Sequence, residues 1–155
     1  MGKLSKINIV IMIISIAVVA GLGSLFVNLG TNWFNILTKP TEWISNVLIP
    51  IVWTVIYLIT AVILFFWIKK EGSLDKKFTI LFVINGILNI LWCLLFFTFG
   101  QMFIGLVIIL LNLLFAIKLI FQLSKYNLVY SYILGIYPLW LSIATALNLA
   151  VWILN

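Results

Sequence analysis

The side chains best suited to chemistry in this sequence are amides and indoles embedded in apolar runs. Asn85, Asn89, Trp92 and Phe96 follow the spacing i, i+4, i+7 and i+11, which places them on one face of a helix. A carboxamide left unpaired in hydrocarbon is strongly unfavourable, so these asparagines must face a partner. Two structures satisfy that need: a polar core that joins helices through hydrogen bonds, and a pocket that holds a ligand.

Three of the seven tryptophans are expected deep within helices, too far from the ends for a simple interfacial position. Trp53 precedes Tyr57 by four residues and Trp140 follows Tyr137 by three, so each indole has an aromatic neighbour on its own face. Trp92 is the third. Buried indole N–H and phenol O–H groups need hydrogen-bond partners, and the asparagines can supply them.

The remaining tryptophans fit the aromatic belt at a membrane–water interface. Trp67 stands beside two lysines and Trp152 stands near the C-terminus, so both are predicted to be belt residues. Trp33 and Trp43 fall in a predicted loop, 28–46. They are either belt residues or part of a lid over one mouth of the protein.

The residue inventory excludes several classes of enzyme and transporter. There is no histidine or arginine, the carboxylates Glu42, Glu71 and Asp75 lie in predicted loops, and Cys93 is the single cysteine. A zinc site and a Ser-His-Asp nucleophile therefore cannot be assembled. Proton-coupled antiporters usually carry a carboxylate inside the membrane, and the predicted spans have none. Cys93 is interpreted as a small apolar side chain within a helix.

The elements that must position these residues are membrane helices. Of the 155 residues, 66% are hydrophobic and only 8% are charged, whereas a soluble domain carries about a quarter charged residues. Long charge-free runs predict an all-α integral membrane protein, a single five-helix domain over 1–155. The predicted helices are 6–27, 47–69, 77–99, 102–124 and 128–153.

The lysines are distributed unevenly between the two ends of such a bundle. All nine cations are lysines, and eight of them fall at the end that holds the N-terminus and the loops 70–76 and 124–128. Only Lys39 falls at the other end. The positive-inside rule therefore predicts a cytoplasmic N-terminus. The net charge of +6 reflects topology, and no nucleic-acid partner is expected because no polar domain exists to carry a basic binding surface.

Three blocks of the sequence are similar to motifs of one known family. W-F-N-I-L-T-K-P (33–40), followed by W-T-V-I-Y (53–57), resembles W-Y-x-x-L-x-K-P. N-I-L-W-C-L-L-F-F (89–97) resembles N-x-x-W-x-x-x-F-F, and W-L-S-I-A-T-A-L-N (140–148) resembles W-x-x-F-A-T-x-L-N. These are motifs of the tryptophan-rich sensory protein (TspO) family, known in mitochondria as the translocator protein or peripheral benzodiazepine receptor. In this order and spacing they cover almost the whole chain.

The resemblance implies a TspO-like five-helix bundle, commonly a homodimer, whose pocket opens toward the loop between the first two helices. Family members bind porphyrins and other tetrapyrroles, and some bind sterols or synthetic benzodiazepine-type ligands. No cofactor beyond such a planar, apolar ligand is implied. The predicted ligand-binding residues are Trp53, Tyr57, Asn89, Trp92, Phe96, Asn112, Trp140, Ala144 and Leu147, with Trp33, Phe34 and Pro40 in the lid.

The function expected from the resemblance is tetrapyrrole binding by a sensor, regulator or carrier in a prokaryotic cell membrane. One alternative is an enzyme that degrades porphyrin photo-oxidatively through Trp53 and Trp140, and another is a transporter of sterols or small lipids. The chain departs from the family at T-E-W-I-S (41–45), where S-W-x-P-P is usual, and at Ile108, where an acidic residue is usual. Its C-terminus also lacks the Tyr and basic residue of the sterol-recognition pattern.

Overall fold

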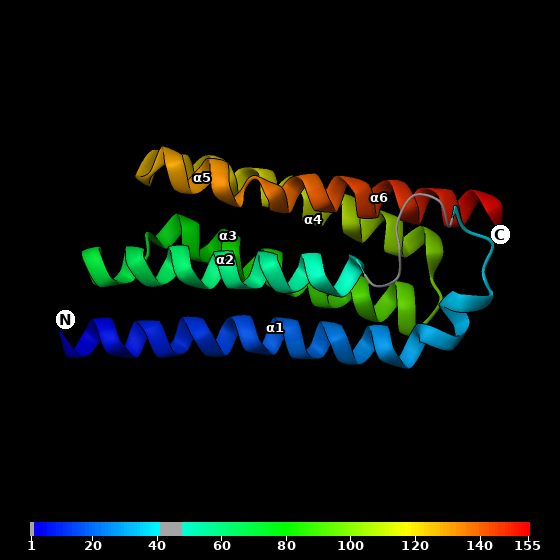
Figure 1. Cartoon of the computed structure of the whole chain (residues 1–155), viewed down its shortest axis with the longest axis horizontal. Coiled ribbons are helices and arrows are strands. Elements are labelled where there is room, and N and C mark those ends of the chain that lie inside the picture. Colours follow the sequence, from blue (N-terminus) through cyan, green and yellow to red (C-terminus); the bar gives the residue numbers. More distant parts are fainter. Residues whose placement is uncertain (1, 41–47) are drawn as a thin grey trace.

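The computed structural model describes residues 2–40 and 48–155, and its helices form one elongated bundle (Figure 1). Five spans in the described part of the chain are long and apolar enough to cross a bilayer, which confirms the predicted fold class. The helices are α1 (Lys3–Ile36), α2 (Leu48–Glu71), α3 (Lys76–Trp92), the π-helical segment η1 (Cys93–Thr98), α4 (Met102–Tyr126), α5 (Leu128–Leu134) and α6 (Ile136–Leu154).

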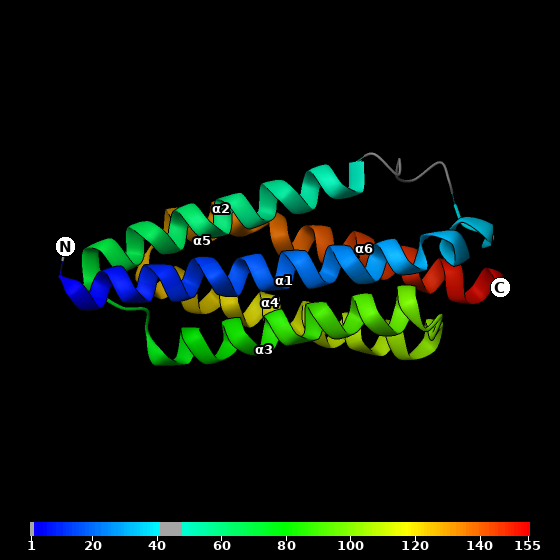
Figure 2. The ribbon, with the colours of Figure 1, turned by 90° about the horizontal axis from the view of Figure 1, so that it is seen from below.

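Successive spans run in opposite directions, so the bundle has two distinct ends (Figure 1). The N-terminus, the α2–α3 connection and the α4–α5 junction lie at one end, called here the N-terminal end. The start of α2, the η1–α4 connection and the C-terminus lie toward the other, the C-terminal end. In Figure 2, α1 lies between α2 and α3, with α4, α5 and α6 behind it.

Helix α1 is much longer than predicted, because it continues to Ile36 instead of ending near residue 27. Trp33 and Phe34 are therefore helical, and their placement in a loop was wrong. Residues 28–36 are polar enough to resemble a loop, but two contacts stabilise them as the last turns of α1. Phe34 is buried against Phe97, with ring centroids 5.2 Å apart, and the Lys39 ammonium donates to the Phe34 carbonyl oxygen at 2.8 Å. A cation that binds the last carbonyls stabilises a helix C-terminus.

The third span ends in the wide turn η1, which approaches α1 closely. A Cβ atom placed on Gly30 would overlap the backbone of Phe97, so only glycine fits this crossing. The Thr98 hydroxyl donates to the Phe26 carbonyl oxygen of α1 at 2.9 Å. Gly100 then turns the chain with a φ of 64°, a conformation that favours glycine. The crossing fixes the position of the aromatic residues on η1.

Substitution of Gly30 by alanine should lower the stability of the protein by about 1–3 kcal/mol, because α1 and η1 must move apart to admit the methyl group. Gly21→Ala is the matched control on the same helix, since an added Cβ there meets nothing within 4 Å. Thermal unfolding in detergent would measure both. Equal midpoints for the two variants would show that the crossing tolerates a side chain.

The fifth span, predicted as one helix over 128–153, is divided at Gly135 into α5 and α6. Pro138 explains the interruption, because it has no N–H to donate to the carbonyl of Leu134 and its ring crowds that carbonyl. The Gly135 N–H instead donates to the carbonyl oxygen of Tyr132 at 3.2 Å. The break sets the direction of α6, which carries Trp140, Ala144 and the other functional candidates of this span.

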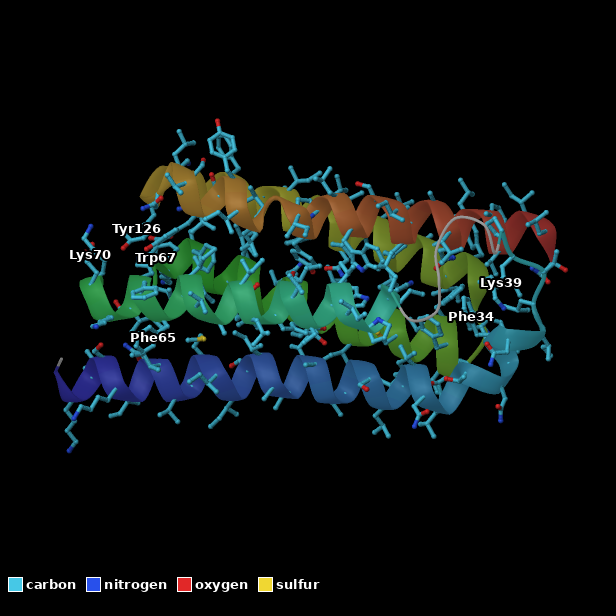
Figure 3. All side chains as sticks on the ribbon, viewed as in Figure 1. Phe34, Lys39, Phe65, Trp67, Lys70 and Tyr126 are labelled. Atoms are coloured by element: carbon cyan, nitrogen blue, oxygen red, sulfur yellow. The ribbon has the colours of Figure 1, made fainter. Side chains whose placement is uncertain are left out.

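The interpretation of Trp67 as a belt residue was wrong. Its side chain is only 3% exposed and stacks on Tyr126 of α4, with centroids 4.1 Å apart and planes 8° from parallel (Figure 3). Phe78 of α3 also packs against the indole, with ring centroids 4.8 Å apart. Trp67 therefore joins α2, α3 and α4 at the N-terminal end. By contrast, Trp152 is 42% exposed, as expected of a belt residue, and Trp43 lies outside the described residues.

Candidate functional site

Asn85 belongs to a buried polar core that joins α3, α4 and α6. Its amide donates to the side-chain oxygen of Asn112 at 2.6 Å, and its own side-chain oxygen accepts from the Tyr137 hydroxyl at 2.9 Å. All three side chains are buried. Asn85 and Asn112 thus serve helix packing, which is the first of the two structures that the sequence allowed. Asn112 lines neither of the two cavities described below.

A second polar link lies closer to the C-terminal end. The Trp92 indole N–H donates to the side-chain oxygen of Asn148 at 3.1 Å, and the Asn148 amide donates to the Met102 carbonyl oxygen at 3.0 Å. This link ties α3 and α6 to the first turn of α4. Asn148 was not among the predicted ligand-binding residues. Its spacing from Trp140 and Ala144, i, i+4 and i+8, was the signal that could have identified it.

The indoles gather around a small cavity beneath the C-terminal end, called here the aromatic cavity. Its volume is about 30 Å³, which is room for about one water molecule. Helices α1, α2, α3, η1 and α6 all contribute to its wall. The lining residues are Phe34, Ile49, Trp53, Trp92, Phe96, Phe97, Trp140, Ala144, Leu147 and Asn148.

The walls of the aromatic cavity are arranged as stacked and edge-on rings. Trp92 is nearly parallel to Phe96, with an angle of 13° and centroids 6.2 Å apart, and Trp53 lies 6.4 Å from Trp92. The Trp140 indole N–H is buried and has no acceptor among the described residues. The cavity therefore offers flat π faces together with one unused hydrogen-bond donor, and no charged side chain lines it among the described residues.

Tyr57 and Tyr137 form an aromatic layer beneath Trp53, and Asn89 lies beyond it. Trp53 stacks on Tyr57 at 5.7 Å and meets the edge of Tyr137 at 6.1 Å. Beyond this layer is a larger space of about 300 Å³, called here the mid-bundle cavity, which Tyr57, Asn89 and Tyr137 line. Asn89 and Trp92, which the sequence placed in one ligand cavity, thus face two different ones.

Of the predicted lid residues, one lines the aromatic cavity and the others lie outside its wall. Phe34 lines the aromatic cavity, and Trp33 packs edge-on against Phe96 at 5.7 Å. The Lys39 ammonium lies 4.7 Å from the centre of the Phe34 ring (Figure 3). Pro40 is half-buried and lines neither cavity. The altered stretch 41–45 lies outside the described residues.

The arrangement suits binding and electron transfer better than acid–base chemistry. No group of three metal-ligating side chains comes together among residues 2–40 and 48–155. Indole rings can stack on a flat conjugated molecule, and they are the most readily oxidised of the side chains that surround the aromatic cavity.

Comparison with curated proteins finds no match for this chain. A comparison with protein-family models gives one result that spans both cavities and all five membrane spans. The TspO/MBR family model matches residues 10–153, a range that includes the three sequence blocks and every side chain of the aromatic cavity. With a match over nearly its whole length, the chain belongs to the TspO/MBR family.

Proposed function

We propose that this multi-pass membrane protein binds a planar tetrapyrrole in the aromatic cavity and acts as a sensor, regulator or carrier of it. The observation that carries the proposal is the convergence of three indoles and three phenyl rings on one cavity that also holds the unpaired Trp140 N–H. Each stacked aromatic pair contributes about 0.5–1.5 kcal/mol beyond buried area. A pyrrole macrocycle presents the flat face that such walls bind.

Binding requires the cavity to widen, because a porphyrin is far larger than the space present. Helix α2 is the element placed to move, since Ile49 and Trp53 line the cavity from its first two turns. Figure 2 shows α2 diverging from α1 toward this end. Outward motion of the α2 start would separate Trp53 from Trp92 and leave the aromatic layer below as a floor. Ligand and open conformation would then stabilise each other.

Lys39 is placed to favour an acidic tetrapyrrole. It is the only lysine expected at the C-terminal end, and its ammonium lies against Phe34, part of the cavity wall. A porphyrin with its ring among the indoles would hold its carboxylates toward the interface, within reach of a flexible lysine. This arrangement favours tetrapyrrole acids over uncharged sterols as ligands.

Titration of the purified protein with protoporphyrin IX in darkness tests the proposal. We expect saturable quenching of tryptophan fluorescence together with a shift of the porphyrin absorption band, because the macrocycle lies against the indoles. Linear, unsaturable quenching with an unshifted band would contradict specific binding.

We further propose that the protein is a homodimer in a prokaryotic cell membrane. Its N-terminus lies in the cytoplasm, as the lysine distribution predicts. A Ser73→Cys substitution on a Cys93→Ser background should react with a membrane-impermeant maleimide only after intact cells are permeabilised. Asn155→Cys on the same background should react before permeabilisation. Labelling of Ser73→Cys in intact cells would show that the N-terminus lies outside the cell, opposite to the proposed orientation.

A further inference from the structure

A groove at the N-terminal end, called here the interfacial groove, lies apart from both cavities. Its volume is about 460 Å³, within the size range of small-molecule pockets. The last two turns of α2 form one side, and the end of α4 with the start of α5 forms the other. The lining residues are Phe66, Lys69, Lys70, Tyr126, Asn127 and Tyr130, none of which lines the aromatic or the mid-bundle cavity.

One wall of the groove is anchored by the stack of Trp67 on Tyr126, whose ring centroids lie 4.1 Å apart. Trp67 is buried, so it holds the Tyr126 ring in place from inside the bundle. The Lys70 ammonium lies 5.7 Å from the centre of the Tyr126 ring, a distance at which a cation is attracted to an aromatic ring. Figure 3 shows these three side chains together at the N-terminal end. The groove therefore has its shape before a ligand binds, which lowers the cost of binding.

The groove carries a positive charge that is only partly balanced. Lys69 and Lys70 both line it, and both side chains are exposed. Glu71 lies 3.6 Å from the Lys70 ammonium, in the one ion pair of the described part of the chain. Asp75, the other carboxylate of this end, caps the first turn of α3. One lysine charge thus remains unmatched, which suits a ligand with a single negative charge.

The opposite wall adds neutral hydrogen-bond donors. The side-chain oxygen of Asn127 caps α5, where it accepts from the Tyr130 N–H at 3.0 Å. The group that Asn127 offers the groove is therefore its amide nitrogen, and Tyr126 and Tyr130 add phenol hydroxyls. Ammonium, amide and phenol groups together suit an anion that is rich in acceptor oxygens, such as a phosphodiester.

The position of the groove indicates that this anion is a lipid headgroup. Lys69 and Lys70 lie in the last turn of the second span, where a bilayer changes from acyl chains to headgroups. Phe66 lines the groove and is half exposed, and Val62, one turn deeper on the same face, is exposed as well. Ile133 provides a second exposed apolar side chain on α5. Acyl chains can follow this surface away from a phosphate held by the lysines.

We propose that the interfacial groove binds a singly charged anionic phospholipid, with its phosphodiester between Lys69 and Lys70 and its acyl chains along α2 and α5. Basic pockets between membrane helices attract anionic headgroups electrostatically. Zwitterionic phospholipids bind more weakly, because their own cation repels the lysines. Free phosphate binds more weakly too, because it lacks the acyl-chain contacts.

Native mass spectrometry of the purified full chain in detergent tests the proposal. The probes are phosphatidylglycerol and phosphatidylcholine with identical acyl chains, and soluble glycerol phosphate is the competitor. We expect one phosphatidylglycerol molecule per chain to bind about tenfold more tightly than phosphatidylcholine, and an equal concentration of glycerol phosphate to leave it bound. Equal affinities for the two lipids, or displacement by glycerol phosphate, would overturn the proposal.

Two matched pairs of lysines separate the groove from the general charge of this end. The double variant Lys69→Gln/Lys70→Gln should lower the affinity for phosphatidylglycerol about tenfold, to the level of phosphatidylcholine. Lys76→Gln/Lys77→Gln removes the same charge from exposed positions on α3, outside the groove, and should leave the affinity unchanged. Equal losses in the two double variants would show unspecific attraction to surface charge and would refute the site.

Asn127→Asp is an independent variant, because it keeps an acceptor for the helix cap but places a negative charge in the groove. It should lower the affinity for phosphatidylglycerol more than about tenfold. Lys76→Gln changes the net charge equally and should bind like the parent. Circular dichroism would check the fold of each variant, and if Lys69→Gln/Lys70→Gln unfolds, Asn127→Asp decides the question. Parental affinity in folded Asn127→Asp would place the lipid outside the groove.

Discussion

Phenylalanine at both Trp53 and Trp140 is expected to reduce any light-dependent loss of porphyrin absorbance much further than it reduces protoporphyrin affinity, which should fall about tenfold. Both indoles line the aromatic cavity, and phenyl rings keep much of their stacking surface. Affinity falls because contact area is lost and because the unpaired Trp140 N–H disappears. Photo-oxidation falls much further, since phenylalanine is far harder to oxidise than indole.

Two measurements on the same samples separate these effects. Quenching of the remaining tryptophan fluorescence gives affinity in darkness, and the decay of porphyrin absorbance under illumination gives the reaction. Trp152→Phe is the control, because this side chain is 42% exposed at the bundle surface, outside both cavities. A double variant that degraded porphyrin at the parental rate would exclude these two indoles from the chemistry.

Asn85→Leu should destabilise the protein by roughly 2–6 kcal/mol, because two buried partners lose their hydrogen bonds at about 1–3 kcal/mol each. The side-chain oxygen of Asn112 would lose its donor, and the Tyr137 hydroxyl would lose its acceptor. The matched control is Asn89→Leu, one turn along the same helix. The Asn89 carboxamide lies beside the Tyr57 and Tyr137 hydroxyls without short hydrogen bonds like those of Asn85, so its loss should lower stability less.

Unfolding of both variants in mixed micelles of increasing denaturing-detergent content would measure the difference. Equal destabilisation by Asn85→Leu and Asn89→Leu would contradict the inference that Asn85 contributes more to helix packing than Asn89 does. Intramembrane hydrogen bonds average only about 0.6 kcal/mol. The prediction for Asn85 is larger because its loss leaves a connected network incomplete rather than a single pair.

Charge-free runs were sufficient to predict the five spans, because a bilayer imposes the same length and apolarity on every helix that crosses it. They could not predict where α1 ends. The segment 28–36 looks like a loop by composition, yet Phe34 is held by Phe97 and its carbonyl by Lys39. These contacts come from residues that are distant in sequence or lie beyond the helix, and no local pattern reveals them.

Helical spacing correctly placed Asn85, Asn89 and Trp92 on one face, but it could not say what that face meets. Along its length the face passes the amide of Asn112, then the mid-bundle cavity, then the side chain of Asn148. The neighbours change because α4 supplies Asn112 at one depth and α6 supplies Asn148 at another, and which helix lies opposite α3 at each depth is a property of the assembled bundle. The sequence therefore left both packing and binding open, with packing favoured, and the hydrogen bonds of Asn85 and Trp92 show that packing occurs.

Trp67 shows what adjacency to lysines can and cannot predict. Lys69 and Lys70 correctly indicate the depth of Trp67 near one end of α2, but depth does not determine which way a side chain faces. Thr60, Leu64 and Trp67 follow the i, i+4, i+7 rhythm, and all three are buried. That periodicity was the better signal, because the indole could stack on Tyr126 inside the bundle.

The most direct test of the account replaces two alanines of α6, two residues apart, with phenylalanine and measures the affinity of each variant for protoporphyrin IX. Ala144 is buried in the wall of the aromatic cavity, and Ala146 is exposed outside both cavities. If the macrocycle occupies this cavity, Ala144→Phe should weaken binding about a hundredfold, because the new ring occupies the ligand's space, and Ala146→Phe should bind like the parent. If both folded variants bind like the parent, the tetrapyrrole does not occupy the aromatic cavity.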